Sequence, residues 1–204
     1  MIAPPARRRR VGVGAAALWA ALCLGAAADA ATSAPEAMSL GNPRAPVTVI
    51  EYASVGCPHC AVWANDVFPL FRKKYIDTGK VRFEFHEMLT GNPVLAAAGF
   101  LIARCVAPGK YFQVVDAVFA GQDEIGRDGM QVLGKIGEQA GLTEAQVTTC
   151  LGDHDALTAL SKRTSADAEA HGVTGTPTFI VGDQKLAGEQ SLEALDAAIA
   201  RVPR

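Results

Sequence analysis

After its first 30 residues the sequence contains no extended basic patch, its longest basic run being the three residues 72–74, and no long apolar run. The first absence argues against a protein that binds nucleic acid, because such proteins carry a basic patch or stripe. The second leaves no candidate for a membrane-spanning helix beyond the N-terminal region. Internal repeats and low-complexity tracts are also absent there. With 204 residues, 50% of them hydrophobic, the chain can bury a core without needing disulfides merely to fold.

The N-terminal 30 residues differ in character from the rest of the chain. Four consecutive arginines at residues 7–10 precede an uncharged stretch at residues 11–28, which is rich in alanine, leucine and glycine. The triplet Ala28-Asp29-Ala30 follows, with the small-residue pattern of a cleavage site. We predict a signal peptide over residues 1–30 that is removed on export, with a permanent membrane anchor as the alternative. Its removal takes away four arginines and one aspartate and changes the formal charge from −2 to −5.

Cysteine is scarce, and its positions are therefore informative. Five cysteines are present, of which Cys23 lies in the predicted signal peptide. The other four are Cys57, Cys60, Cys105 and Cys150, and an even number in an exported protein suggests two disulfide pairs. Cys57 and Cys60 form the natural local pair, which leaves Cys105 with Cys150. Two buried free thiols are the alternative for this second pair.

The pattern of apolar residues before residue 92 predicts a strand, a helix and a second strand. Residues 47–53 are mostly apolar and β-branched, as in a buried parallel strand. Residues 57–75 carry large apolar side chains at helical spacing, and residues 80–88 alternate between apolar and polar side chains. Two parallel strands joined by a right-handed helical crossover are the simplest arrangement of these elements.

The middle of the chain shows only helical patterns. We expect five helices between residues 92 and 171, separated by loops that include the stretch at residues 121–129, which is rich in glycine and aspartate. Strand patterns return at residues 178–181 and 185–187, and a last helix begins after Ser191.

This order of elements predicts an α/β fold with an inserted all-helical domain. Residues 31–91 and 172–204 would form a small sandwich, and residues 92–171 would form the insert. In this arrangement Cys57 lies where the first long strand meets the first helix.

The segment Cys57-Pro58-His59-Cys60 is the strongest chemical signal in the sequence. Half of a zinc site is the alternative, but zinc normally needs four ligands and the sequence has no second close pair. At a helix N-terminus, free N–H groups and the helix dipole stabilise a thiolate at Cys57, the nucleophile in disulfide exchange. Pro58 suits the first turn, and His59 can add positive charge or donate a hydrogen bond. Cys60, within that turn, is placed to resolve a mixed disulfide, and a stabilised thiolate makes the disulfide form more oxidising.

Glu51 is an acid within an otherwise apolar strand, six residues before Cys57. If the strand is buried on both faces, an unpaired carboxylate at this position is costly. We predict that Glu51 is a buried acid beneath the cysteine pair that relays protons for Cys60. An exposed side chain on a partly solvated face is the alternative.

The segment Gly-Val-Thr-Gly-Thr-Pro-Thr at residues 172–178 places Pro177 at the start of a strand. This proline lies either in a plain turn or in a cis peptide bond. The histidines His86, His154 and His171 have no partner that the sequence reveals, and we expect structural or solvated roles for them. We therefore predict no metal site and no cofactor.

Together, these motifs resemble the DsbA-like thiol–disulfide oxidoreductases. The resemblance covers about residues 39–202 and rests on Gly-Asn-Pro at residues 41–43, Glu51, the Cys57–Cys60 motif, the helical insert and Gly-Thr-Pro-Thr-Phe at residues 175–179. It implies a thioredoxin-like fold with an inserted helical domain, and a periplasmic location in a Gram-negative bacterium. It also implies that Pro177 is cis and faces the cysteines, and that Thr176, Pro177 and Pro58 help to hold a substrate peptide.

The resemblance further implies partners and a second disulfide. Its substrates would be unfolded or newly exported proteins, and a membrane-bound, DsbB-like partner would reoxidise the cysteine pair. Some members, including an alphaproteobacterial type, carry a disulfide in the helical domain, which corresponds to Cys105–Cys150. Thr176 departs from the best-known oxidases, which carry valine there, and matches a residue common in related isomerases.

The sequence leaves several functions open, of which we expect a dithiol oxidase. We expect a monomer, because only about ten residues separate the signal peptide from the fold, whereas the related isomerases usually dimerise through an N-terminal domain. A disulfide isomerase or reductase of the same fold is the main alternative. The intact Cys57/Cys60 pair argues against a non-catalytic binding module, and against glutathione-dependent enzymes, which normally lack the second active-site cysteine.

Overall fold

The computed structural model of the protein describes residue 1 and residues 37–203. The predicted signal peptide, residues 1–30, lies outside this described part except for Met1. Within the described residues, none of the helices combines the length and the apolar composition needed to cross a membrane.

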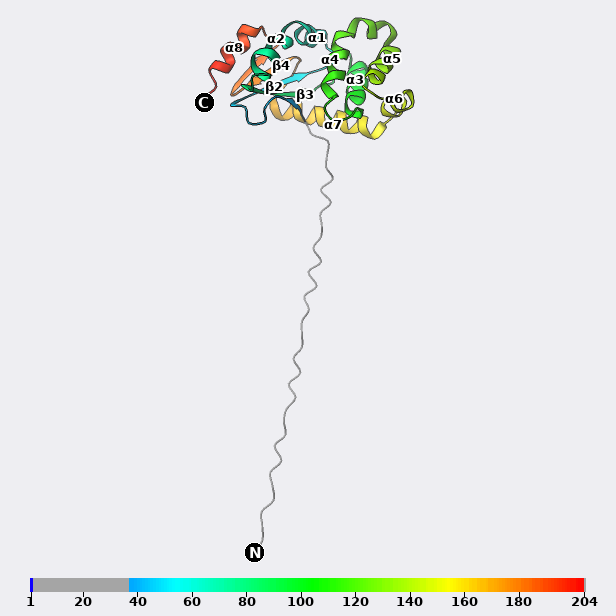
Figure 1. The fold of residues 1–204 in the computed structure, drawn as a ribbon, viewed down its shortest axis with the longest axis horizontal. Helices are drawn as coiled ribbons and strands as arrows, with labels where there is room; N and C mark the ends of the chain where they lie inside the picture. Colours follow the sequence, from blue (N-terminus) through cyan, green and yellow to red (C-terminus); the bar gives the residue numbers. More distant parts are fainter. Residues whose placement is uncertain (2–36, 204) are drawn as a thin grey trace. The chain divides into compact units, whose positions relative to one another are not determined.

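A five-stranded sheet forms the centre of the described fold (Figure 1). The strands lie in the order β1-β3-β2-β4-β5, with bounds Met38–Leu40 (β1), Val47–Ala53 (β2), Val81–Glu87 (β3), Thr178–Val181 (β4) and Gln184–Ala187 (β5). β2 and β3 pair in parallel, as the sequence predicted, and the other neighbours pair antiparallel. β1 was not predicted, because three residues are too few to show an alternating pattern.

The predicted helix after Cys57 is confirmed, although it is interrupted by π-helical turns. Its parts are α1 (Pro58–Val62), η1 (Trp63–Val67), α2 (Phe68–Phe71) and η2 (Arg72–Ile76), of which the two η segments are π-helical. Trp63, Phe71 and Tyr75 are buried at helical spacing, which explains why the helical pattern was visible in the sequence, whereas Val62 and Leu70 are exposed.

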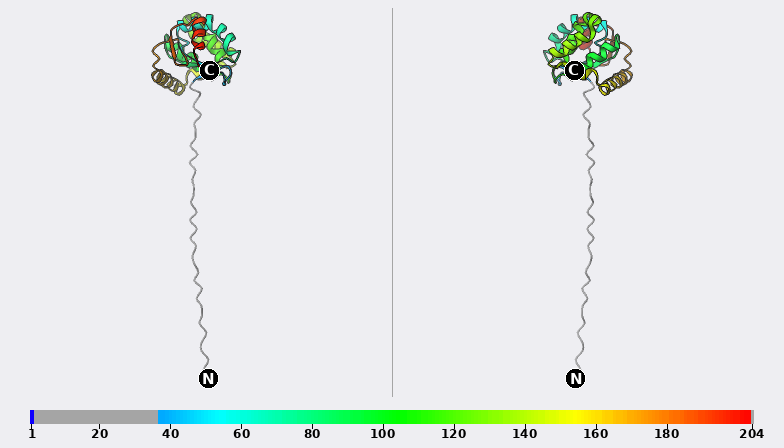
Figure 2. Two further views of the ribbon diagram at one scale, coloured as in Figure 1. Left: turned by 90° about the vertical axis from the view of Figure 1, so that its left-hand side faces the viewer. Right: turned by 90° about the vertical axis from the view of Figure 1, so that its right-hand side faces the viewer.

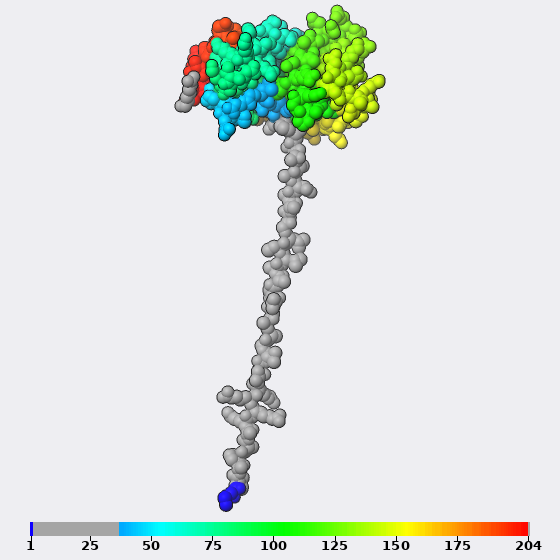
Figure 3. Space-filling model, in the orientation of Figure 1, coloured from blue at the N-terminus to red at the C-terminus, as the bar shows by residue number. Residues whose placement is uncertain are grey.

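Five helices follow β3, as predicted, before the chain returns to the sheet. They are α3 (Pro93–Cys105), α4 (Tyr111–Ala120), α5 (Gln122–Gln139), α6 (Glu144–Leu151) and α7 (His154–His171), and α8 (Leu192–Ala200) ends the fold. Side-chain caps begin several of them: Asn92 caps α3, Asp153 caps α7, and Thr143 forms the expected capping box with Gln146. On the face drawn in Figure 3, the green to yellow helices gather at one end and red α8 lies at the other.

The prediction of a loop at residues 121–129 is wrong. Helix α5 begins at Gln122 and runs through this stretch, with a kink at Asp128, whose φ is −125° and ψ is 31°. Gly126 and Gly129 each cost a helix about 1 kcal/mol relative to alanine. Ile125 is only 5% exposed and packs into the core, so tertiary burial offsets this local cost.

Helices cover both faces of the sheet. On one face, a buried cluster is formed by Tyr52, Met88 and Val173 and is covered by Ala168 of α7. Helix α7 lies to one side of the other helices in both views of Figure 2. On the opposite face the ring of Trp63 lies 4.7 Å from that of Phe179. Glu51 belongs to this second face, because neighbouring strand residues alternate between faces.

A buried acid links the helical insert to the end of β3. Glu87 is 2% exposed and accepts hydrogen bonds from Arg104 of α3 at 2.8 and 2.9 Å, from Tyr111 of α4 at 2.8 Å and from Arg163 of α7 at 2.6 Å. Such pairing compensates the cost of burying the carboxylate. Three helices of the insert are thereby fixed to one strand end.

Candidate active site

The junction of β2 and α1 places Cys57 at the start of a helix. After Ala53 the chain turns through Ser54, whose carbonyl accepts the Cys57 N–H at 3.0 Å and whose hydroxyl accepts the Gly56 N–H at 3.1 Å. Cys57 is the N-cap residue, and Pro58 occupies the first turn, where its missing N–H removes no helical hydrogen bond. The sulfur therefore lies where the first N–H groups of the helix have no intrahelical partner.

Two glycines bring the start of the insert directly against this turn. The Asn92 N–H donates to the Gly56 carbonyl at 2.8 Å. A Cβ atom on Gly56 would lie 2.2 Å from the Asn92 carbonyl oxygen, and one on Gly91 would lie 2.2 Å from the Gly56 oxygen. Gly91 also has a φ of 70°, a conformation that disfavours other residues. Both positions therefore require glycine if the two segments are to approach this closely.

Cys57 and Cys60 are free thiols, 6% and 0% exposed. A hydrogen bond from the Cys60 thiol lowers the pKa of Cys57 to about 5, although burial acts in the opposite direction. Thr176 and the backbone N–H groups of Cys60 and His59 stabilise the thiolate further. The same hydrogen bond, then burial and the charge of Glu51, raise the pKa of Cys60. The pair thus combines one ready nucleophile with one thiol that keeps its proton.

The segment containing Pro177 lies beside the nucleophile. The Thr176–Pro177 peptide bond is cis, and the Cys57 thiol lies 3.5 Å from the Thr176 carbonyl oxygen, which accepts its hydrogen bond. Thr176 Oγ1 lies 2.6 Å from Thr90 Oγ1. The Thr90 carbonyl in turn accepts a hydrogen bond from Ser54 Oγ at 2.9 Å. Hydrogen bonds therefore join three segments that are far apart in the sequence, around Ser54, Thr90 and Thr176, next to the turn that carries Cys57.

Glu51 lies in the middle of β2, in register with Phe85 of β3 and Phe179 of β4. It is 2% exposed, and its Oε1 atom has no hydrogen-bond partner among the described residues. Burial, and then the charge of Cys57, raise the pKa of Glu51 well above its ordinary value. Glu51 is therefore a buried acid that is electrostatically coupled to the cysteine pair, and an exposed position on a solvated face is excluded.

His59 is exposed, in contrast to the two buried thiols. Its Nδ1 atom lies 2.5 Å from Oε1 of Glu189, and this hydrogen bond, with the charge of Glu189, raises the pKa of His59. The contribution of His59 to the Cys57 thiolate comes from its backbone N–H. When protonated, the imidazole adds a positive charge at the rim of the site and pairs with Glu189, an acid that was not predicted to lie there.

Gln122 is a further residue at the site that sequence reasoning missed. Its Nε2 atom donates to the carbonyl oxygens of Val55 at 2.7 Å and of Cys57 at 3.2 Å. Helix α5 of the insert thus supports the turn that carries the nucleophile. Gln122, Thr90 and Glu189 reach the site only through tertiary packing, so no local sequence signal could have identified them.

Cys105 and Cys150 are joined by a disulfide, with Cα atoms 6.2 Å apart. Cys105 is the last residue of α3, and Cys150 lies in the last turn of α6. The predicted residues therefore lie in two places. Glu51, Cys57, Cys60 and Thr176–Pro177 lie together around the cysteine pair, whereas the Cys105–Cys150 disulfide lies within the helical insert.

His86 and His171 both pair with a buried acid. His86 Nδ1 lies 2.5 Å from Asp167, which also pairs with His171, so both rings have structural partners; His154 begins α7. Among the residues that the structure describes, no group of three or more histidine, cysteine, aspartate or glutamate side chains is placed to hold a metal ion.

Comparisons with known proteins agree with this geometry. The thioredoxin family model matches residues 33–201. A Rickettsia conorii protein provisionally named a protein-disulfide oxidoreductase is 32% identical over 165 residues, which cover 79% of this chain and 58% of that protein. A Rickettsia prowazekii protein of the same name is 33% identical over 147 residues, which cover 71% of this chain and 53% of the relative. The chain thus spans little more than half the length of these relatives.

Among solved structures, alpha-DsbA1 of Wolbachia pipientis superimposes with a TM-score of 0.73 at 26% identity. The match covers 83% of this chain and 92% of that chain, so it includes the helical insert as well as the sheet. The chain belongs to the thioredoxin family, and its fold is the thioredoxin-like fold with a helical insertion that DsbA proteins have.

Proposed function

We propose that the protein is a thiol–disulfide oxidoreductase that oxidises dithiols to disulfides in exported proteins. The observation that carries the proposal is the Cys57 sulfur, which combines a pKa of about 5 with a position 3.5 Å from the Thr176 carbonyl, beside the buried Cys60 thiol. A low pKa of the Cys57 thiol means that its thiolate is stabilised. A stabilised thiolate favours the reduced pair and so makes the disulfide a stronger oxidant.

The reaction consists of two exchange steps. A substrate thiolate attacks Sγ of Cys57 in the Cys57–Cys60 disulfide, the disulfide breaks, and Cys60 leaves as a thiolate that takes up a proton. A second substrate thiolate then attacks the substrate sulfur of the mixed disulfide, and Cys57 leaves as a thiolate. The substrate is oxidised by two electrons, and the cysteine pair is reduced by two.

Glu51 would supply the proton that Cys60 takes up. Burial raises the pKa of Glu51 and so favours its protonated form, and its charge is coupled electrostatically to Cys60. A thiol with a raised pKa is a poor leaving group unless its thiolate is protonated as it forms, so a nearby acid accelerates the step.

The substrate peptide would lie across Thr176, Pro177 and Pro58. Pro58 is exposed, and the Thr176 carbonyl lies next to the sulfur that is attacked. Backbone contacts at this segment would hold peptides of many sequences, which suits an enzyme with unfolded or newly exported proteins as substrates.

We propose a periplasmic location, based on the signal-peptide pattern of residues 1–30. The mature chain would consist of residues 31–91 and 172–204 as the thioredoxin-like domain, with residues 92–171 as the inserted domain. It would act as a monomer, and a membrane-bound, DsbB-like partner would return the cysteine pair to the disulfide. The disulfide between Cys105 and Cys150 would serve a structural role.

Disulfide isomerisation is a second candidate, which Thr176 favours over a plain oxidase. Three assays separate the functions: oxidation of a reduced peptide, reduction of insulin and refolding of scrambled ribonuclease. We expect the first to be fast and Cys57→Ser to abolish it, whereas Cys60→Ser should accumulate mixed disulfides. Failure of the wild-type protein in all three assays would instead favour a binding module.

A further inference from the structure

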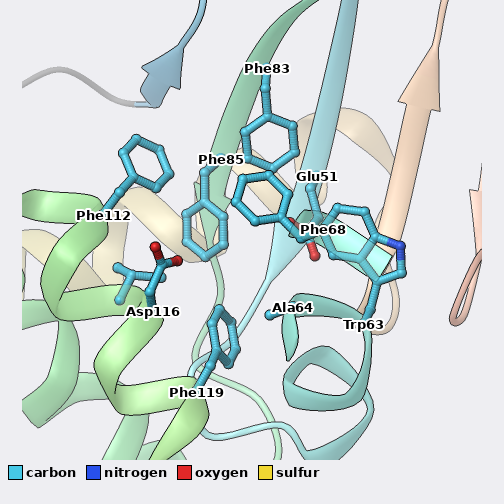
Figure 4. A pocket seen from close by; sticks show the side chains of 10 residues that line it. Glu51, Trp63, Ala64, Phe68, Phe83, Phe85, Phe112, Asp116 and Phe119 are labelled. Atoms are coloured by element: carbon cyan, nitrogen blue, oxygen red, sulfur yellow. The ribbon is translucent and has the colours of Figure 1, made fainter. Parts of the chain in front are cut away.

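A small cavity lies directly against Glu51 on the sheet face that carries the cysteine pair (Figure 4). Its lining is almost entirely apolar, and the residues that form it are Glu51, Trp63, Ala64, Phe68, Phe83, Phe85, Phe112, Val115, Asp116 and Phe119. Glu51 and Asp116 are the two acids in this lining. They come from β2 and α4, which places a helix of the insert across the cavity from the buried acid.

Glu51 has an unmet hydrogen-bonding requirement at this cavity. Its Oε1 atom is buried without a partner among the described residues. Leaving a carboxyl oxygen unpaired in an apolar site costs several kcal/mol on transfer scales. The centre of a water molecule can occupy a volume of about 10 Å³ in this cavity, which is room for about one water molecule. A water there would bond to Glu51 and would need a second polar group, and Asp116 is the other acid of the lining.

Asp116 also borders a second, larger hollow that reaches the surface. This hollow shares Ala64, Phe68 and Asp116 with the cavity and is completed by Asn65, Pro69, Arg72 and Ala120. The centres of water molecules can occupy a volume of about 300 Å³ in this hollow. The ionisable groups of the two linings are therefore Glu51, Asp116 and Arg72, and Asp116 is the one that borders both hollows and is also exposed.

We propose that Asp116 is a positioning residue that exchanges the proton of Glu51 with solvent through a water in this cavity. The inference rests on the proposed function, because it concerns the proton that Cys60 takes up. When Cys60 leaves as a thiolate it takes the Glu51 proton, and the Glu51 carboxylate takes a proton from the water in the cavity. The protonated carboxyl group of Asp116 returns a proton to that water, and the resulting Asp116 carboxylate is then reprotonated by solvent. The net transfer is one proton from solvent to Cys60, and reoxidation of the pair reverses it.

The surroundings of Asp116 suit this role. Asp116 is exposed at the surface, but partial desolvation of its carboxyl group raises its pKa from the ordinary aspartate value, and Arg72 acts in the opposite direction. A carboxyl group transfers protons best when its pKa approaches the working pH. The rest of the lining consists of aromatic side chains together with Ala64 and Val115, so Asp116 is the only acid besides Glu51 among the described residues that line the cavity.

The test compares Asp116→Asn with Asp66→Asn, a matched loss of one exposed carboxylate on η1 that borders neither hollow. Stopped-flow mixing of the oxidised protein with a small dithiol, followed by acid quenching and thiol alkylation, gives the rate at which Cys57–Cys60 is reduced. We expect Asp116→Asn to slow this step roughly tenfold, a modest share of what proton transfer contributes to catalysis. Asp116→Glu should restore the rate, and small buffer acids should accelerate Asp116→Asn but not the wild type.

The effect of Asp116→Asn should also be measured in the Glu51→Gln variant, because this double variant shows whether the two residues act on the same proton. In that variant the additional change Asp116→Asn should have no further effect, because both residues act on the same proton. Equal rates for Asp116→Asn and Asp66→Asn, or independent effects of Asp116 and Glu51, would overturn the proton route while leaving the oxidoreductase function intact. A wild-type protein that does not exchange disulfides would overturn both.

Discussion

The hydroxyl oxygens of Thr90 and Thr176 lie 2.6 Å apart, beside the Cys57 sulfur. Thr176 lowers the pKa of Cys57, and a hydroxyl can donate only one hydrogen bond. If Thr90 donates to Thr176, the Thr176 hydrogen remains available to the thiolate. Thr90 therefore fixes the orientation of a group that stabilises the nucleophile, although it does not contact the sulfur itself.

Replacing Thr90 by valine should consequently raise the pKa of Cys57. The Thr176 hydroxyl would lose its donor and would divide its time between orientations, so we expect an increase of about 0.5–1 unit, equivalent to roughly 1 kcal/mol. The thiolate absorbance of the reduced protein as a function of pH measures the change. Thr48→Val, on an exposed position of β2, is the control, and an unchanged titration in Thr90→Val would refute the role of the hydroxyl pair.

The stability of the reduced protein should depend on pH through Cys57. Its pKa falls from an ordinary 9.0 to about 5 in the folded state, so the stabilisation is complete above pH 9 and is lost as the pH falls through 5. At pH 7 the contribution is about 2–3 kcal/mol. Urea unfolding at pH 5 and 7 should show this dependence in the reduced wild type. The oxidised protein and Cys57→Ser should lack it, and a parallel dependence in all three forms would contradict the assignment.

Glu51→Gln should stabilise the protein near neutral pH even though it slows exchange. The folded pKa of Glu51 is raised above 4.5, so the favourable contribution of Glu51 exists below pH 4.5 and is lost as the pH rises. We expect the variant to be more stable than the wild type at pH 8, with the difference disappearing near pH 4. Glu138→Gln, an exposed acid on α5, should show neither effect. Destabilisation at pH 8 would indicate that Glu51 is charged and paired in the native state.

Removal of the Cys105–Cys150 disulfide should lower stability without abolishing exchange. The bond spans 45 residues of sequence, and a loop of that length corresponds to about 4 kcal/mol in the chain-entropy model, of which variants commonly lose about 2–4. The double change Cys105→Ala and Cys150→Ala should lower the urea midpoint accordingly. Strong reductant should produce the same loss in the wild type, and unchanged stability of the double variant would show that the bond is not formed in solution.

The parts of the site that local chemistry determines were visible in the sequence. An apolar strand with one acid, followed by a cysteine pair at a helix start, located Glu51, Cys57 and Cys60, because alternation and helix-terminus effects act over a few residues. The segment before Phe179 was identified through resemblance, since its proximity to Cys57 depends on the whole sheet.

The remaining features are tertiary and left no local trace. Gln122 was assigned to a loop because of the glycines around it, but burial of Ile125 keeps the segment helical. In the sequence Asp116 is an ordinary polar residue of a helix, and only the packing of α4 brings it to the cavity that Glu51 also lines. Glu189 meets His59 from 130 residues away. Such pairings follow from how helices dock, which sequence periodicity does not determine.

The equilibrium between the Cys57–Cys60 pair and glutathione tests the central claim most directly, because it measures the consequence of the stabilised thiolate. The Cys57 pKa of about 5 predicts an oxidising pair. We expect a reduction potential less negative than about −200 mV for the wild-type protein, and a more negative value for Thr90→Val. A wild-type value near the roughly −270 mV of thioredoxin would contradict the assignment of this protein as an oxidase.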